Sequence, residues 1–107
     1  ANKSNVKIAI IQAVDRKVPL ESIAESKGLE YEELLDKLEA IVYSGTRINI
    51  KYDIDERLDP DDQEELFEYF KESESGDLEE AYEEYGDVYS EEEIRLMRIR
   101  FLSEMGN

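Results

Sequence analysis

The 107-residue sequence contains no cysteine and no histidine, and its five glycines stand singly. Without cysteine the chain forms no disulfide and offers no thiolate as a nucleophile or metal ligand. Without histidine it lacks the usual general base of enzymes and their commonest metal ligand. Carboxylates alone do not define an active site, because paired acid catalysis also needs a substrate cleft. These absences exclude most hydrolase and transferase mechanisms.

Long apolar runs and phosphate-binding loops are missing as well. No run approaches the roughly 20 residues of a membrane span, and no signal peptide leads the chain. No G-x-x-x-x-G-K-[ST] motif occurs, so P-loop nucleotide hydrolysis is excluded. The sequence predicts a soluble, cytoplasmic chain that is not an enzyme and holds no cofactor or metal. Because it begins Ala1-Asn2-Lys3-Ser4 without methionine, we expect a fragment of a longer protein.

Charge is divided unequally between two halves of the sequence. Residues 1–54 carry 9 acidic and 8 basic side chains, whereas residues 55–107 carry 20 acidic and 5 basic. Between residues 55 and 93, 19 acids face only Arg57 and Lys71, a net charge of -17. Such a field repels nucleic acid phosphate and attracts cations and basic protein surfaces. Any DNA contact therefore has to use the nearly neutral half.

Apolar spacing in residues 4–45 predicts three helices in a helix-turn-helix arrangement. The first covers residues 4–15, the second runs from Pro19 to Gly28, and the third begins at Tyr31 and stops at Ser44-Gly45. Ala24 is small enough for two helices to cross closely, and Gly28 lies at the tight turn. An ordinary helical hairpin is the alternative, since Ala and Gly four residues apart are common.

Residues 46–55 alternate between apolar and polar side chains, which predicts a half-buried strand where a wing would follow. Its partner would be a short piece such as Lys17-Val18, or the same strand of a second copy, which would give a dimer by strand pairing.

Three acidic helices are expected after the strand. Asp59-Pro60 starts the first, residues 78–85 form the second, and a capping box of Ser90 and Glu93 starts the third. The predicted fold is a single mainly α domain over residues 1–107. It has a winged-helix-like helix-turn-helix part with one β-strand at residues 4–55 and an acidic three-helix part at 56–107, sharing one core. Arg95, Arg98 and Arg100 are expected to pair with neighbouring carboxylates.

A calcium loop is the sharpest metal hypothesis. In residues 53–64, acids occupy five positions of the EF-hand pattern, namely Asp53, Asp55, Asp59, Asp61 and Glu64. Arg57 stands where a fifth-position oxygen is needed, and Leu58 replaces the glycine of the sharp turn. We therefore favour solvated acids at a helix start over a metal site.

Two sets of charged residues are candidates for binding a partner. The third helix would face DNA with Glu32, Glu33, Asp36, Lys37, Glu39 and Tyr43. Most of these are acidic, which argues against base reading. Weak contact with the DNA backbone would instead use Arg16, Lys17, Arg47 and Lys51. A basic protein surface would meet the acidic face of Glu79, Glu80, Glu83 and Glu84.

Several runs together resemble a known family. They are Ala24-Glu25-Ser26-Lys27-Gly28-Leu29, Glu33-Leu34-Leu35-Asp36, residues 38–46, Ile48-Asn49-Ile50 and Glu68-Tyr69-Phe70-Lys71-Glu72-Ser73. This pattern is similar to the C-terminal helix-turn-helix domain of bacterial RecQ-type DNA helicases, particularly those of Bacteroidetes. Residues 89–95 and 101–107 look like the natural C-terminus of such a protein.

The resemblance implies a parent that unwinds DNA with ATP and Mg²⁺ in repair and recombination, in the bacterial cytoplasm at the nucleoid. Its motor would precede Ala1, and none of the motor motifs falls on this chain. We expect an accessory domain that contacts the rest of the helicase or a basic protein, with DNA contact weak or indirect. The alternative is a free-standing acidic module that imitates DNA.

Overall fold

The computed structural model describes residues 3–106, and these form seven helices. In chain order they are α1 (Lys3–Asp15), α2 (Leu20–Ser26), α3 (Tyr31–Tyr43), α4 (Lys51–Ile54), α5 (Pro60–Glu72), α6 (Leu78–Tyr85) and α7 (Glu91–Met105).

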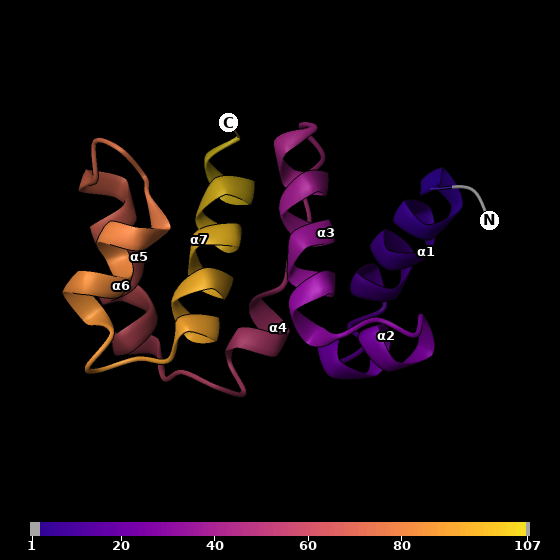
Figure 1. The fold of residues 1–107 in the computed structure, drawn as a ribbon, viewed down its shortest axis with the longest axis horizontal. Helices are drawn as coiled ribbons and strands as arrows, with labels where there is room; N and C mark the ends of the chain where they lie inside the picture. Colours follow the sequence, from indigo (N-terminus) through magenta and orange to yellow (C-terminus); the bar gives the residue numbers. More distant parts are fainter. Residues whose placement is uncertain (1–2, 107) are drawn as a thin grey trace.

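The helices stand in a row that follows the long axis of the molecule (Figure 1), whose extents are 39 × 25 × 21 Å. α7 lies in the middle, with α5 and α6 on one side and α3 on the other. α1 leans away from α3 at the far end of the row, while α2 and α4 lie across the lower edge. The C-terminal helix therefore joins the two halves of the sequence.

The predicted helix-turn-helix elements are present in the first half. Gly28 follows α2 with φ +67°, a left-handed conformation that glycine adopts without the strain a Cβ would cause. Leu20, Ile23 and Ala24 of α2 are buried against α3. At the start of α3, the Glu30 backbone N–H donates to Glu33 Oε1 at 2.8 Å, which satisfies one free amide.

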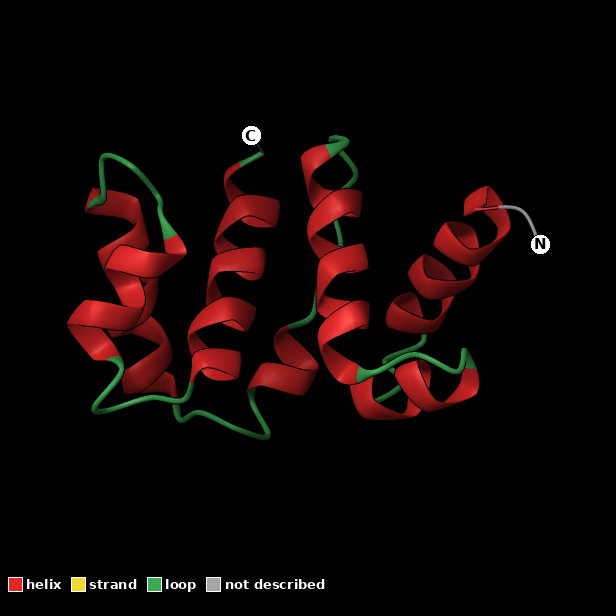
Figure 2. Cartoon of the chain, in the orientation of Figure 1, coloured by secondary structure: helices red, strands yellow, loops and turns green. Residues whose placement is uncertain are grey.

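The predicted strand at residues 46–55 is wrong. Among residues 3–106 no strand occurs (Figure 2): residues 46–50 are an irregular segment, and α4 follows directly. Ile50 and Ile54 are both buried, and their spacing of four fits a helix as well as an alternating strand. The part at 4–55 is thus helix-turn-helix without a wing, and a dimer by strand pairing has no strand to use in the described chain.

Ser103 of α7 replaces the missing strand partner. The Ile48 backbone N–H donates to Ser103 Oγ at 2.9 Å, and the same hydroxyl donates to the Ile48 carbonyl at 2.7 Å. Buried backbone groups need a partner of some kind, and here one side chain serves both. The irregular segment at residues 46–50 is therefore held at this place without a sheet.

The acidic half begins its helices as the sequence predicts. Asp59 Oδ1 accepts from the Asp62 N–H at 3.0 Å, with Pro60 as the first helical residue of α5. Ser90 and Glu93 form a reciprocal capping box at the start of α7. Local signals of this kind fix helix starts without help from tertiary structure.

One cluster of buried side chains extends through both halves of the molecule. It includes Ile10 and Leu38 from the first half and Leu66, Phe70 and Ile99 from the second. In the acidic half the helices are lined by aromatic rings, with Tyr69 in edge-to-face contact with Phe70 and Tyr85. The sharp change of surface charge at residue 54 therefore does not coincide with a break in the core.

Candidate functional site

Part of the face of α3 that a recognition helix would turn toward DNA lies against α7. Arg95 reaches across from α7, and its Nη2 contacts Glu39 Oε1 at 2.8 Å and Asp36 Oδ1. Its Nε donates to Glu39 Oε2 at 3.0 Å, so the pair is bidentate. The carboxylates of Glu39 and Asp36 raise the pKa of Arg95, although its partial burial opposes this.

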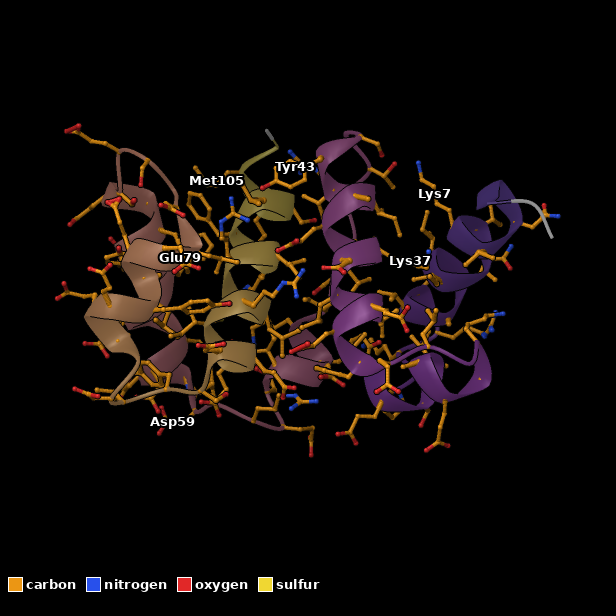
Figure 3. The ribbon with its side chains drawn as sticks, in the orientation of Figure 1. Lys7, Lys37, Tyr43, Asp59, Glu79 and Met105 are labelled. Atoms are coloured by element: carbon orange, nitrogen blue, oxygen red, sulfur yellow. The ribbon has the colours of Figure 1, made fainter. Side chains whose placement is uncertain are left out.

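Arg98 continues this contact one turn further along α7. Its Nη2 donates to Tyr43 Oη at 2.8 Å, and its guanidinium lies 5.9 Å from the centre of the Tyr43 ring. Its Nε donates to the Gly76 carbonyl at 2.7 Å, which ties the loop before α6 to the same place. In Figure 3, Tyr43 lies at the upper end of α3 on the side of α7.

Three of the six residues expected to face DNA therefore contact α7. Only 17% of the Glu39 side chain is exposed, whereas Asp36 and Tyr43 contact arginines of α7 and stay mostly exposed. The arginines do pair with carboxylates, but Arg95 and Arg98 find theirs in the other half of the sequence. Arg100 pairs with Glu104 on its own helix, as predicted. The sequence held one signal for this contact: Asp36 and Glu39 on α3 are three residues apart, and so are Arg95 and Arg98 on α7.

The four basic residues predicted to touch DNA do not form one patch. Lys17 and Lys51 line the same pocket between the end of α1 and α4, together with Asp15 and Asp55. Lys51 is paired with Asp55 at 3.0 Å. Arg47 lies elsewhere, with its guanidinium against Gly106 at the end of α7. Arg16 is exposed next to Lys17. The acids beside the lysines weaken the attraction of this pocket for phosphate.

A comparison with protein families found a match to the first half of the chain. The model described as RecQ-1-like, helix-turn-helix domain matches residues 4–54. Residues 4–54 are thus similar to the helix-turn-helix domain of this family. The resemblance seen in the sequence is confirmed at this level, and the bacterial, Bacteroidetes-type source stays a prediction. A comparison with curated proteins found no match for the chain.

The RecQ-1-like domain ends at the residue where the charge changes. The match stops at Ile54, and the acidic helices begin beyond it. Here α7, from the acidic half, packs directly against α3 of the matched region.

The acidic face predicted on α6 is exposed. Glu79, Glu80, Glu83 and Glu84 all lie at the surface, while Ala81 between them is buried. Glu80 also borders a shallow groove of about 780 Å³ between α5 and α6, whose other walls include Glu65, Glu68 and Tyr85. The face and the groove share Glu80 and together form a negative surface that α7 separates from α3.

The acids of the rejected calcium loop have structural tasks. Asp53 is buried, and its Oδ1 accepts from the Leu20 N–H at 3.0 Å at the start of α2. Its Oδ2 accepts from Arg57 Nε at 3.1 Å. Hydrogen bonds from Gln63 and Lys51 lower the pKa of Asp55. Within residues 3–106 no three acidic side chains come together as a metal site would require.

The described helices show no membrane-spanning character. None of them, over residues 3–106, has the length and apolar composition that a bilayer crossing requires.

Proposed function

We propose that this chain is a non-catalytic accessory domain of a RecQ-type DNA helicase and that it works by contacting protein rather than by reading DNA bases. One observation carries this proposal: Arg95 and Arg98 of α7 pair with Asp36, Glu39 and Tyr43, three of the six side chains of α3 that would face DNA. A recognition helix cannot use side chains that are already paired within the fold.

The acidic surface supports the same conclusion. A net charge of -16 opposes the phosphate backbone, whose attraction to basic side chains supplies most non-specific DNA affinity. The same charge favours a basic partner surface. The rest of the parent helicase, which would supply ATP and Mg²⁺ chemistry in repair or recombination, contains such a surface where it holds DNA.

The proposal extends to regulation of the motor. The negative surface of α5 and α6 competes with DNA for the basic channel of the helicase and restrains unwinding until substrate arrives. Charge reversal at Glu79, Glu80, Glu83 and Glu84, with lysine at each, should raise the DNA affinity of the full-length enzyme at low salt. Unchanged affinity and unwinding with an intact fold would instead favour an external partner.

A titration of labelled duplex DNA tests the first step with the 107-residue chain. At about 100 mM salt, where screening is moderate, no complex should form below the micromolar range. The fourfold lysine variant, whose net charge rises by eight from -16 to -8, is the matched control and should bind more tightly than the original chain. Submicromolar affinity of the original chain would overturn the proposal.

An acidic DNA mimic that acts alone is the second candidate, favoured by the exposed glutamates of α6. It predicts that the chain blocks DNA-binding proteins unrelated to its parent. The coding sequence upstream of Ala1 separates the two, since only the first requires motor domains there.

A further inference from the structure

An apolar groove lies between α1 and α3, on the side of α3 that is turned away from α7. Its floor is made by Val6 and Ile10 of α1 and by Ala40 and Ile41 of α3. The groove encloses about 220 Å³. It lies where the two helices diverge at the far end of the row in Figure 1.

α1 carries more apolar surface than the fold buries. Ile8 is 50% exposed, and Val6 and Ile11 are only partly buried. On the opposite wall Ala40 is exposed, so a partner could approach the α3 backbone closely. Within the groove, Val6 and Ala40 supply the exposed apolar surface, whereas Ile10 and Ile41 beneath them are buried and Ile8 lies outside it.

Two lysines border the groove, and neither is paired with a carboxylate. Lys7 Nζ donates to Ser44 Oγ at 3.2 Å, and no acidic oxygen lies within 4.0 Å of Lys7 or Lys37 among the described side chains. Glu33, one turn before Lys37, has its carboxylate at the Glu30 N–H. In Figure 3 both lysines project on the α1 side of α3.

We propose that this groove binds an amphipathic helix of a protein partner, with apolar side chains on the floor and carboxylates against Lys7 and Lys37. A third helix fits because the groove is bounded by two helices, whose ridges and furrows match another helix. Unpaired cations beside an apolar floor are complementary to a helix with acidic flanks. Phosphate groups of DNA gain nothing from the apolar floor.

This surface does not depend on the function proposed for the acidic half. α6 lies at the other end of the row from α1, so one partner can occupy the groove while the acidic face is free. The groove also prefers partners of the opposite charge from those that the whole chain attracts. A protein of net charge -16 attracts basic peptides in general, whereas the groove selects acidic ones.

Two designed helical peptides provide the test with the 107-residue chain. One has leucine at positions i, i+3, i+4 and i+7 with glutamate on both flanks; the other has lysine in place of each glutamate. We expect the glutamate peptide to bind at least about 10-fold more tightly. Amide chemical shifts should change at Val6, Ile10, Ala40 and Ile41. Charge reversal of both groove lysines, K7E with K37E, should invert the preference.

Two further variants keep this test decisive. Lys71→Glu lowers the net charge as each groove substitution does but lies on α5, so the preference should not change. Ala40→Gln fills the groove from an exposed helix position without adding charge and should weaken binding of the glutamate peptide, with helix content checked by circular dichroism. Equal or better binding of the lysine peptide at the groove, or shifts confined to other residues, would contradict the proposal. Self-association of the chain that Ala40→Gln abolishes would overturn it in favour of a second copy.

Discussion

The two halves of the molecule use basic side chains in opposite ways. In residues 55–106, Arg57, Arg95, Arg98 and Arg100 all make ion pairs. In the first half, among described side chains, only Lys51 does. The basic residues of the first half without an ion pair within 4.0 Å are Lys7, Arg16, Lys17, Lys27, Lys37 and Arg47. The four arginines of the acidic half are thus used for structure, with Lys71 exposed and outside these ion pairs, whereas most basic residues of the nearly neutral half make no ion pair.

This difference explains how a strongly acidic region can share a core with a neutral one. The carboxylates of the second half are mostly exposed, where water screens their repulsion. The contacts that cross between the halves include apolar side chains, arginines of α7, the Ser103 hydroxyl and Arg57. The surface charge therefore changes at residue 54, whereas the core continues across it. The predictions below test whether the two halves are one folding unit.

The largest effect is expected from cavities in the shared core. Leu38→Ala and Phe70→Ala should each lower the free energy of unfolding by about 2–5 kcal/mol, because both side chains are almost completely buried. Thermal melting followed by circular dichroism and by tyrosine fluorescence should give one transition for either variant. Two separate transitions in the unmodified chain would show that the halves unfold independently.

The arginine that crosses between the halves comes next. Arg95→Met should cost about 1–3 kcal/mol, since it leaves the largely buried Glu39 carboxylate without its bidentate partner. Combining it with Glu39→Gln should cost less than the sum of the two single changes. Urea unfolding of the four proteins gives this coupling. Additive effects would mean that the pair does not link α3 and α7 energetically.

Ser103→Ala tests how the segment before α4 is held. The substitution leaves the Ile48 N–H and carbonyl without their common partner, and we expect a loss of about 1–2 kcal/mol. Ser22→Ala on the exposed side of α2 is the control and should change stability by less than about 0.5 kcal/mol. Equal effects would contradict the role given to Ser103.

These residues also show what the sequence could and could not predict. Helix starts at Asp59 and Ser90 depend on neighbours within a few residues, so local patterns identified them. The prediction of a strand was wrong because its apolar residues fit two periods at once. They stand at every second position, as in a strand, and two of them, Ile50 and Ile54, are also four residues apart, as in a helix. The partners of Arg95 and Ser103 lie more than 50 residues away. No local rule pairs residues so far apart, although the matching spacing of Asp36 with Glu39 and of Arg95 with Arg98 was a hint of this contact.

Alkaline pH should weaken the molecule through buried phenols. Burial raises the pKa of Tyr31 and of Tyr52 to about 12, against about 10 in the unfolded chain. A raised pKa in the folded state favours the protonated phenol, so this stabilisation is complete below pH 10 and is lost as pH rises to about 12. Absorbance at 295 nm should show a late ionisation step that Tyr52→Phe reduces. Ionisation of every tyrosine near pH 10 in the folded chain would contradict this.

The smallest effect is expected where the charge is greatest. Glu79 and Glu80 lie in the first turn of α6, where negative charge interacts favourably with the helix dipole, whereas Glu83 and Glu84 lie in its last turn. Lysine at both positions of either pair raises the net charge by four, from -16 to -12, so both variants relieve the same overall repulsion. The E83K/E84K variant should therefore be more stable than E79K/E80K by about 1 kcal/mol, with both within about 1 kcal/mol of the original chain. Thermal melting at about 20 mM and about 500 mM salt measures this, and the difference should shrink as salt screens the dipole interaction.

Such small effects would mean that the stability of the fold does not require these glutamates, which would favour contact with a partner as their role. A loss of several kcal/mol in both variants would instead make the acidic face part of the fold's own stability.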